Sequence, residues 1–437
     1  MNRRRFLTHT GAALLGASSL SMAPPSAASS RGSHASVLIL GAGFAGASLA
    51  WALKRWAPNL AVTVVAAPER YWTCPFSNTA LLAPTDLETL EVRYDAFSGA
   101  GAPTLIRARV RAVEPEHRAL ILEDGRRLTG DKLVLAPGIE LATEAIDGYD
   151  DAAAARFPHA WEAGPESLRL AERLRAVPDG GLVVMTIPPN PYRCPPGPYE
   201  RASLLAWWLQ RHRPRTKLLL LDGKDRFTKD ALFKAAWEAR YPNLEWQGLS
   251  NGAGLRRVDG KTGLIETDFD RFSPDLGNVI PPQRAPALLR RAGLDGGQGW
   301  CPIEPTGFES PLAKDVHILG DAAIANPMPK SAFAANSQGK ACAAALIADL
   351  AGVPRPDPIL LNTCYSLVAP DAGIAVVGSY AVKGGRLESV AAGSGLSPSP
   401  SALGESVSTV RGAEAAHARG WYESIRVDAF REGGSRS

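Results

Sequence analysis

Two regions of the chain repeat one pattern of apolar and polar positions: a short β-branched or apolar run, a helical stretch, and a second apolar run. In the first region the apolar runs are residues 37–40 and 60–67, with a helical stretch between them. In the second they are 182–187 and 217–223, on either side of a helical stretch at 199–212. This pattern is typical of βαβ units with a parallel sheet, so we expect an α/β fold containing two such units.

The last part of the chain has a different pattern. Residues 360–380 alternate like a strand and predict a C-terminal sheet, and residues 390–406 are rich in Gly, Ser and Pro and predict a mobile loop. In residues 411–430, Trp421, Ile425 and Phe430 recur at loosely helical spacing, which favours packing on the protein body. We assign the domains as 36–160 with 286–350, an inserted unit at 175–285, and a C-terminal cap at 354–437.

A glycine motif connects the first strand to its helix. Gly41, Gly43 and Gly46 have the spacing G-x-G-x-x-G within this βαβ unit. The first glycine permits a tight turn, the second a close approach to a pyrophosphate, and the third close packing of the helix. The second strand ends in Ala66, where an acidic residue usually binds ribose, so Glu69 or backbone groups would take over that role.

Two later segments indicate FAD rather than NAD. "DKLVLAPGIE" is an apolar strand that ends at Ala136 and Gly138, and "VHILGDAAIA" is a strand that ends at Gly320 and Asp321. Both resemble segments of flavoproteins with two dinucleotide-type domains, in which the first closes the FAD domain and the aspartate binds the ribityl chain. In that order along the chain, with the glycine motif, they predict a bound FAD.

The second βαβ unit lacks a glycine loop. Its strand is followed by "PPNPYRCPPGP", and each proline removes a backbone N–H and fixes φ. Such a loop cannot surround a phosphate with amide donors. We therefore predict that this unit holds no nicotinamide, that another donor reduces the flavin, and that Cys194 in this loop contacts that donor.

The chain has five cysteines, an odd number that leaves at least one thiol unpaired. Cys194 and Cys364 would form a redox disulfide over the flavin ring if the C-terminal sheet covers it; a purely structural disulfide between domains is the alternative. Cys74 is either an ordinary free thiol or a covalent link to FAD. Cys301 and Cys342 are expected to be buried thiols.

The motifs "YWTC", "RCPPGPYERAS", "GWCPIE", "FES", "GDAAIANPMPKSAFAANSQGK" and "NTCYS" resemble those of the flavoprotein subunit of flavocytochrome c sulfide dehydrogenase over nearly the whole mature chain. The resemblance implies a glutathione-reductase-like flavoprotein with a C-terminal α+β capping domain. It also implies that Cys74 carries FAD through a thioether, that Cys194 and Cys364 form the active disulfide, and that Glu200 is the base that deprotonates hydrogen sulfide. Ala66, Pro75 and Phe76 depart from the expected family pattern.

Near the predicted site, a helix starting near Asn336 would direct its positive end at the flavin and favour its anionic reduced form. Lys330 would add to that field, or else be a solvated charge at a turn. We expect no metal site.

The N-terminus resembles a bacterial twin-arginine export signal, with Arg3, Arg4, Phe6 and Leu7 before a short apolar stretch. We expect residues 1–30 to be this signal, cleaved between Ala28 and Ala35, and the mature protein to be periplasmic. After it, no stretch has the ~18 consecutive apolar residues of a membrane span. The formal charge of +4 includes these terminal arginines, so the charge predicts no nucleic-acid or membrane-surface partner.

No C-x-x-C-H motif occurs, so this chain carries no c-type haem of its own. The predicted function is a sulfide dehydrogenase that oxidises hydrogen sulfide to sulfur or polysulfide and passes electrons to a c-type cytochrome subunit or a soluble cytochrome c. Two alternatives stay open. One is a sulfide:quinone oxidoreductase; the other is an accessory flavoprotein that reactivates a sulfur-carrier protein of thiosulfate oxidation.

Overall fold

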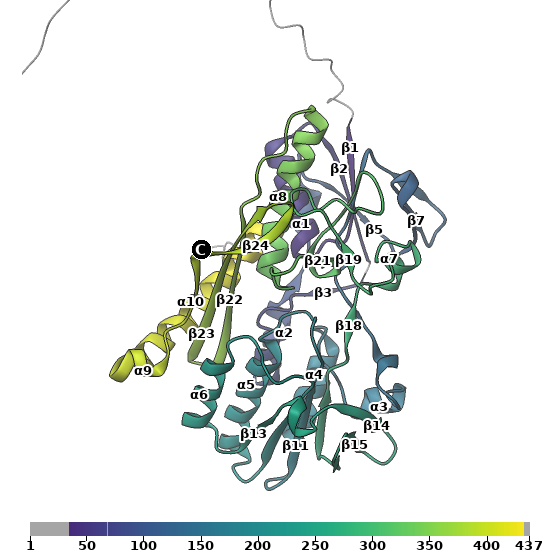
Figure 1. Cartoon of the computed structure of the whole chain (residues 1–437). Helices are drawn as coiled ribbons and strands as arrows, with labels where there is room; N and C mark the ends of the chain where they lie inside the picture. The colour runs from purple at the N-terminus through teal and green to yellow at the C-terminus, as the bar shows by residue number, and fades with distance from the viewer. Residues whose placement is uncertain (1–34, 68, 432–437) are drawn as a thin grey trace, which may run out of the picture.

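The structure is a computed structural model that describes residues 35–67 and 69–431 (Figure 1). The predicted export signal lies outside the described residues. Within the described part of the chain, none of the helices combines the length and apolar character needed to cross a membrane. The fold is the predicted one, with two βαβ-type units and a C-terminal part built from a sheet and a helix.

The first unit is a parallel five-stranded sheet in the order β20-β9-β1-β2-β5. Its strands are β1 (Ser36–Leu40), β2 (Ala61–Ala66), β5 (Thr104–Arg107), β9 (Lys132–Leu135) and β20 (Val316–Ile318). Alternate side chains of β1 enter different cores, because neighbouring residues of a strand point to opposite faces. Val37 and Ile39 pack with α1 (Phe44–Trp56) and α8 (Ala332–Ala351). Leu38 and Leu40 pack with the antiparallel strands β6 (Val110–Glu114), β7 (Ala119–Leu122) and β8 (Arg127–Thr129).

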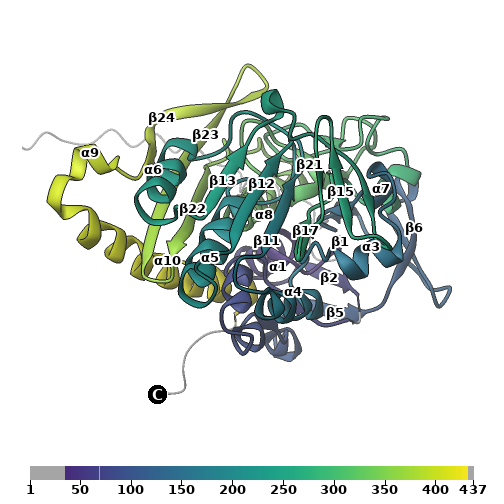
Figure 2. The same ribbon diagram turned by 90° about the horizontal axis from the view of Figure 1, so that it is seen from below.

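The second unit is a parallel sheet in the order β13-β12-β11-β17, formed by β11 (Leu182–Ile187), β12 (Lys217–Asp222), β13 (Leu244–Gln247) and β17 (Leu276–Val279). Helices α4 (Pro165–Ala176), α5 (Gly197–His212) and α6 (Asp230–Arg240) share a core with one face. The other face packs against α3 (Asp151–Arg156) and a meander of β14 (Leu255–Asp259), β15 (Leu264–Thr267) and β16 (Arg271–Phe272), as Figure 2 shows.

Short elements lie between the strands of the first unit or connect it to the second. They are β3 (Tyr71–Trp72) paired with β4 (Glu91–Val92), α2 (Asp86–Thr89), β10 (Glu140–Leu141) paired with β18 (Gln283–Arg284), α7 (Ala287–Arg291), and β19 (Cys301–Pro302) paired with β21 (Ala323–Ile324). The β10–β18 ladder ties together the two chain crossings between the units. The site described below lies near these crossings.

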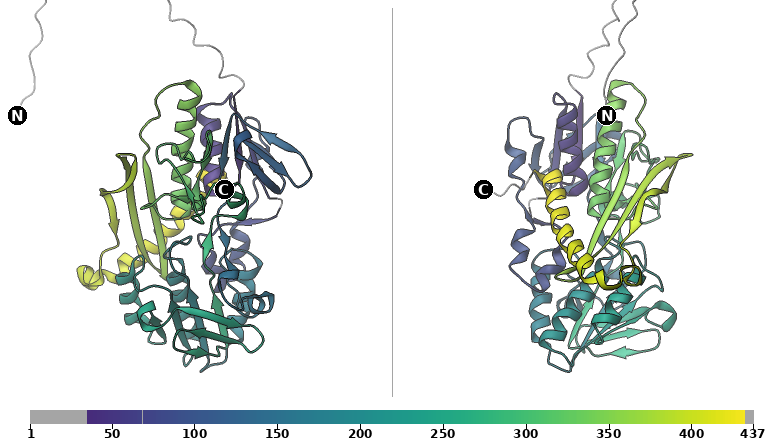
Figure 3. Two further views of the ribbon diagram at one scale, coloured as in Figure 1. Left: turned by 45° about the vertical axis from the view of Figure 1, so that its right-hand side comes forward. Right: turned by 90° about the vertical axis from the view of Figure 1, so that its left-hand side faces the viewer.

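The C-terminal part is an antiparallel sheet of β22 (Leu360–Ala369), β23 (Ala372–Lys383) and β24 (Arg386–Leu396), followed by α9 (Pro400–Leu403) and α10 (Val407–Phe430). Strand β22 is an edge strand and contacts both α8 of the first unit and α5 of the second (Figure 3). The prediction of a mobile loop at 390–406 is wrong for most of its length. The segment pairs with β23 as far as Leu396, opposite Val376, and then forms α9.

Helix α10 packs on the protein body, as its sequence pattern predicted. Ile425 and Phe430 are buried, and the Phe430 ring lies 5.0 Å from that of Phe44 and 6.0 Å from that of Tyr94. The apolar face of α10 is therefore covered by the first unit.

Helices α1 and α8 approach closely at Gly339. A Cβ added there would lie 2.5 Å from the Ala45 carbonyl oxygen and 3.0 Å from the Leu49 nitrogen. Because backbone atoms cannot move aside cheaply, we expect Gly339→Val to destabilise the protein by about 1–3 kcal/mol or more. Thermal unfolding measures this. Gly420→Val is the matched control, because Gly420 also lies in a helix but has no atom within 4 Å of the added Cβ. Equal melting temperatures for the two variants would contradict the prediction.

Candidate functional site

A cavity of about 550 Å³ lies where the carboxyl ends of the first sheet meet the loop before α5 and strand β22. The parallel register creates this meeting point: Leu40 aligns with Val65 and Leu135, and Leu135 aligns with Ile318. The segments that follow these strands therefore lie side by side at one edge of the sheet. Open α/β sheets bind their ligands at such an edge.

The glycine loop has the geometry that a bound pyrophosphate requires. Gly41 has φ +96, and a Cβ there would lie 2.2 Å from the Ala136 carbonyl oxygen. A Cβ at Gly46 would lie 1.9 Å from the Gly41 carbonyl oxygen, so this glycine serves the close packing of α1 and does not line the cavity. Gly43 lines the cavity and begins α1 without a side-chain cap, which leaves the first amides of the helix for an anion.

The other predicted cofactor residues also line the cavity: Ala136, Gly138, Gly320 and Asp321. Burial raises the pKa of the Asp321 carboxyl, and the Oδ1 atom of Asp321 is buried without a hydrogen-bond partner among the described residues. Three more cavity residues have such a polar atom: Trp161 Nε1, Arg193 Nε and Trp421 Nε1. Since buried polar atoms are normally satisfied, this cavity fits a large polar ligand such as FAD.

No acidic residue ends β2, as the sequence indicated. Ala66 and Ala67 line the cavity, and so does Glu69, which pairs with Arg109 and has about half of its side chain exposed. Arg107 also lines the cavity and donates to the Ala67 carbonyl at 3.3 Å. Glu69 therefore lies at the cavity wall, where a ribose hydroxyl would be within its reach. Its carboxylate is already paired with Arg109.

Cys194 lies in a tight turn of the proline-rich loop. Its φ of +57 is in the left-handed region, which is uncommon for residues other than glycine. The amide of Cys194 donates to the Lys330 carbonyl at 2.7 Å, and the Gly197 amide donates back to the Cys194 carbonyl at 2.8 Å. Helix α5 starts at Gly197, where a Cβ would lie 3.0 Å from the Cys194 sulfur. The turn thereby fixes the thiol at the cavity wall.

Three thiols meet in this cavity. The neighbouring thiols of Cys364 and Cys74, together with burial, raise the pKa of Cys194. The neighbouring Cys194 thiol in turn lowers the pKa of Cys74 to about 7, helped by the charges of Arg193 and Arg201. It also lowers the pKa of Cys364, which is stabilised as an anion by Lys229 as well. The surroundings therefore favour the protonated form of Cys194 and the thiolate forms of Cys74 and Cys364.

All five cysteines are free thiols in the structure. The structure thus brings Cys194 and Cys364 together in the dithiol form, and the disulfide between them stays a prediction. Cys364 lies within β22, opposite Val376, and not beside a turn, because Asn362 and Thr363 already belong to the strand. Cys301 and Cys342 are buried outside the cavity, as predicted.

Glu200 lines the cavity from the first turn of α5. Its Oε1 accepts from the Leu367 amide at 2.7 Å and its Oε2 from Asn78 Nδ2 at 2.8 Å. Burial raises the pKa of Glu200, and these two hydrogen bonds oppose the rise. A carboxylate with a raised pKa, close to the thiols, is suited to exchanging a proton near neutral pH.

Lys330 is not the solvated charge that was the alternative interpretation, and its charge acts on the cavity residue Asp321. Its ammonium donates to the carbonyls of Asp321 and Ala323, both at 2.7 Å, and lies 3.8 Å from the centre of the Trp300 ring. Burial lowers its pKa to about 8, and the residue does not line the cavity. Helix α8 begins at Ala332 and not near Asn336, because Ser331 caps it by accepting from the Ala334 amide. Ser331 and Ala332 line the cavity, so this helix directs its N-terminus at the cavity.

Sequence reasoning missed several buried charges around the site, among them Arg193, Arg201 and Lys229. Arg201 is 2% exposed and donates to Asn78, Asn278 and the His159 and Ala160 carbonyls. The adjacency of Arg193 to Cys194 was the available signal for Arg193. The residues adjacent in sequence to Lys229 and Arg201 give no sign that these two side chains are buried.

Side chains fill the crevice of the second unit where a nicotinamide nucleotide would lie. Asp222 ends β12, at the position that binds ribose in dinucleotide folds. Its carboxylate is fully buried and accepts from Tyr199 at 2.7 Å, Trp246 at 3.0 Å and Lys224 at 2.6 Å. The Tyr199 ring stacks on Phe227 with 3.7 Å between centroids. These contacts support the prediction that this unit holds no nicotinamide.

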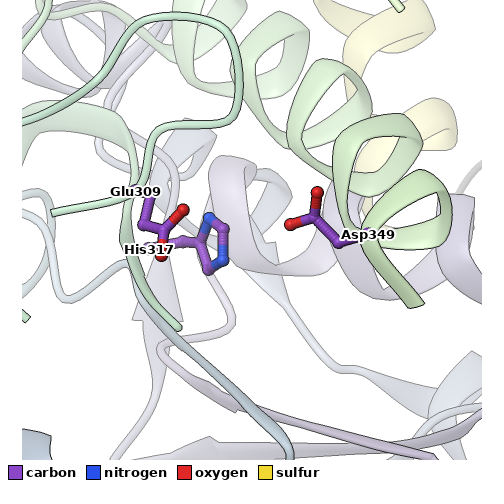
Figure 4. A group of neighbouring side chains, drawn as sticks. All are labelled: Glu309, His317 and Asp349. Atoms are coloured by element: carbon purple, nitrogen blue, oxygen red, sulfur yellow. The ribbon is translucent and has the colours of Figure 1, made fainter. Parts of the chain in front are cut away.

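A separate cluster joins Glu309, His317 and Asp349, whose ligand atoms lie within 4.8 Å of one another (Figure 4). Arg355 donates to Glu309 at 2.6 Å and to Asp349 at 2.7 and 2.8 Å, and Lys132 lies 3.3 Å from Asp349. His317 Nε2 is buried without a partner among the described residues, but the carboxylates that a cation would need already have two counter-ions. We interpret the cluster as an ion-pair network between α8 and β20.

Comparison with known proteins places this fold among flavoproteins. The chain is 22% identical over 317 residues to the mitochondrial sulfide:quinone oxidoreductase of Mus musculus, which covers 70% of this chain and 69% of that protein. The Dictyostelium discoideum protein of the same name is 23% identical and covers 73% and 72%. The solved structure of the Aquifex aeolicus sulfide:quinone oxidoreductase aligns with a TM-score of 0.70 at 15% identity, over 91% of this chain and 93% of that one.

Three family models match successive parts of the chain. Residues 35–165 match the pyridine nucleotide-disulphide oxidoreductase family. Residues 167–281 match the central part of the sulfide dehydrogenase (flavocytochrome c) flavoprotein chain, and residues 356–430 match the flavin-binding part of flavocytochrome c sulphide dehydrogenase. These matches include the loop of Cys194 and the strand of Cys364. On these matches, together with the cavity that both cysteines line, the chain belongs to the flavoprotein family of flavocytochrome c sulfide dehydrogenase.

Proposed function

We propose that this protein is a periplasmic, FAD-dependent sulfide dehydrogenase. It oxidises hydrogen sulfide to sulfur or polysulfide through Cys194 and Cys364 and passes the electrons to a c-type cytochrome. The observation that carries the proposal is that Cys194 and Cys364, from distant parts of the chain, line one cavity together with the glycine loop. Bound FAD would supply the two-electron acceptor for this pair of sulfurs.

Sulfide chemistry at the cysteine pair begins with the disulfide. Hydrosulfide attacks one sulfur of a Cys194–Cys364 disulfide, which forms a bond to the substrate sulfur, breaks the bond between the cysteines and releases the other cysteine as a thiolate. The product is a cysteine persulfide beside a thiolate. The substrate sulfur is then released at the level of elemental sulfur, and the two cysteines form the disulfide again. For each sulfide oxidised, two electrons remain, which bound FAD would accept.

Glu200 would serve as the base for this reaction. Its carboxylate lines the same cavity as both thiols, and its raised pKa suits it to accept the proton of hydrogen sulfide. The two hydrogen bonds to Asn78 and Leu367 orient it. Because Leu367 lies three residues after Cys364 in β22, the same contact also holds the cysteine strand against α5.

Cys74 would hold the cofactor covalently. Its thiol lines the cavity and has a lowered pKa of about 7, owing first to the contact with Cys194. A thiolate at neutral pH is the reactive form for bond formation to carbon. Gly41, Gly43, Asp321 and the N-terminus of α8 would position the remaining cofactor groups.

A c-type cytochrome is the proposed electron acceptor, because the family is one of flavocytochromes and the chain has no haem-attachment motif. Quinone is the second candidate, favoured by the printed names of the Mus musculus and Dictyostelium discoideum relatives. Quinone reduction requires an apolar surface for the membrane. Ile425 and Phe430 of the C-terminal helix are buried and so do not contribute to such a surface.

Export by the twin-arginine route would place the protein in the periplasm. Arg3, Arg4, Phe6 and Leu7 are the residues that support this localisation. Because that route carries folded proteins, the chain would collect its cofactor before export.

Replacing Cys194 tests the disulfide mechanism. We expect Cys194→Ser to lower the rate of sulfide-driven flavin reduction by about 10³-fold or more, because a single member of a reacting pair cannot form the disulfide. Anaerobic stopped-flow absorbance measures the rate. Cys301→Ala is the control, since Cys301 is buried outside the cavity. Undiminished reduction in Cys194→Ser would exclude the mechanism.

Mass spectrometry of denatured protein tests the covalent link. The peptide containing Cys74 should carry the mass of FAD, and Cys74→Ala should hold flavin that is released on denaturation. A Cys74 peptide of unmodified mass in flavin-loaded wild-type protein would show that the link does not form.

Steady-state assays with two acceptors test the electron-transfer partner. Sulfide should reduce cytochrome c, with the cytochrome subunit present, faster than it reduces a soluble quinone analogue. The reverse order would favour a sulfide:quinone oxidoreductase. Failure with both acceptors would favour the accessory role in thiosulfate oxidation.

A further inference from the structure

Lys229 lies against β22, the strand that carries Cys364, and does not line the cavity. It directly precedes α6 with φ +65 and is 5% exposed. Its ammonium donates to Ser366 Oγ at 2.8 Å, to the Cys364 carbonyl at 3.3 Å and to the Ile374 carbonyl at 3.4 Å. The second unit thus inserts a positive charge against the strand that carries Cys364.

The hydrogen-bond partners of this ammonium are all neutral. Burying a charge without a counter-charge is costly, so a compensating anion is expected nearby. Burial lowers the pKa of Lys229, and the acidic groups that oppose this are Cys364, Glu200, Cys194 and, from α10, Glu414. Glu414 is already engaged by Arg411 and Ser397, so the groups of the cavity are the ones left to balance Lys229.

A lysine nearby in the sequence, Lys224, shows how a buried ammonium is usually neutralised. Lys224 is also largely buried, with 12% of its side chain exposed, but it binds the Asp222 carboxylate directly at 2.6 Å. Lys229 has no carboxylate hydrogen-bonded to it among the described residues. The difference indicates that the counter-charge of Lys229 lies among the cavity groups that it does not touch directly, namely Glu200 and the thiols.

We propose that Lys229 is a positioning residue that holds negative charge on the Cys364 sulfur during sulfide oxidation. The inference deepens the proposed function and rests on it. Attack of hydrosulfide on the disulfide leaves Cys364 either as the released thiolate or as the persulfide, which becomes an anion once its proton passes to Glu200 or water. Both forms put one negative charge on the strand that Lys229 touches.

The other charged groups that face Cys364 do not replace Lys229. Cys194, Glu200 and Cys74 are acidic or neutral, so they cannot stabilise an anion on Cys364 by charge. Arg201 faces Cys74, Glu200 and Cys194, and its guanidinium donates to Asn78 and Asn278 and to backbone carbonyls. Lys229 is therefore the cation assigned to Cys364.

The test measures the reactivity of Cys364 and not turnover. Flavin-loaded protein is reduced anaerobically with a phosphine and treated with iodoacetamide across a range of pH, and alkylation of the Cys364 peptide is followed by mass spectrometry. Removing the cation raises the thiol pKa and lowers the thiolate fraction at a given pH. In Lys229→Met and Lys229→Gln we expect alkylation at pH 7 to be about tenfold slower, with the profile moved to higher pH.

Two variants serve as controls. Lys229→Arg keeps the charge and should keep a profile near that of the wild type. Lys234→Met removes an exposed lysine from the same helix and should change nothing. Lys229→Gln can still donate to the carbonyls and to Ser366, which preserves a folded variant for comparison if Lys229→Met loses its flavin.

The proposal is overturned if the Lys229→Gln profile matches that of the wild type, or if Lys229→Arg shifts as far as Lys229→Gln, because packing and not charge would then be responsible. Sulfide-driven flavin reduction by the wild type is measured separately. Its absence would defeat the proposed function, whereas the alkylation profiles would still decide whether Lys229 controls the charge on Cys364.

Discussion

The hydrogen bond between the Cys194 amide and the Lys330 carbonyl holds the reactive part of this molecule together. It stabilises a left-handed residue in a loop whose prolines provide few other donors. Lys330 is itself fixed by its ammonium, which bonds the carbonyls of Asp321 and Ala323. One chain of contacts therefore runs from the strand end that faces the cofactor, through Lys330, to the reactive sulfur.

A second set of contacts holds β22, the strand that carries Cys364. Glu200 accepts a hydrogen bond from the Leu367 amide, and Lys229 donates one to the Cys364 carbonyl. Two residues of the second unit therefore hold β22 in place. Three separate segments of sequence thus place their sulfurs in one cavity. A reaction between side chains requires preorganisation of this kind, because moving a reacting atom by one ångström greatly lowers the reaction rate.

Local features of the sequence were sufficient for the cofactor half of the site. Gly41, Gly43 and Gly46 lie between a strand and a helix, and the strand ends at Ala136 and Gly320 are marked by small residues. Because these strands are parallel and in register, their carboxyl ends lie at the same edge of the sheet. Asp321 follows the end of β20 and therefore lies at that edge too. The pairing of Cys194 with Cys364 was first suggested by their positions in the loop and in the C-terminal sheet, and the family resemblance implied it as well.

The buried charges were beyond sequence reasoning, because their environment is made by distant segments. Lys229 looks like a helix-start lysine until Ser366 and Ile374 cover it, and Lys330 turns toward Trp300 and not toward the cavity or solvent. Residues 390–396 have loop-like composition, yet β23 offers them a backbone ladder to extend. In each case tertiary contact overrode local preference.

The packed crevice at the end of β12 limits what changes in the proline-rich loop alone could achieve. Replacing prolines by glycines before α5 would leave Asp222 tied to Tyr199, Trp246 and Lys224, and would leave Phe227 stacked on Tyr199. Opening this crevice to a nucleotide would therefore require replacements among these packed side chains as well as in the loop.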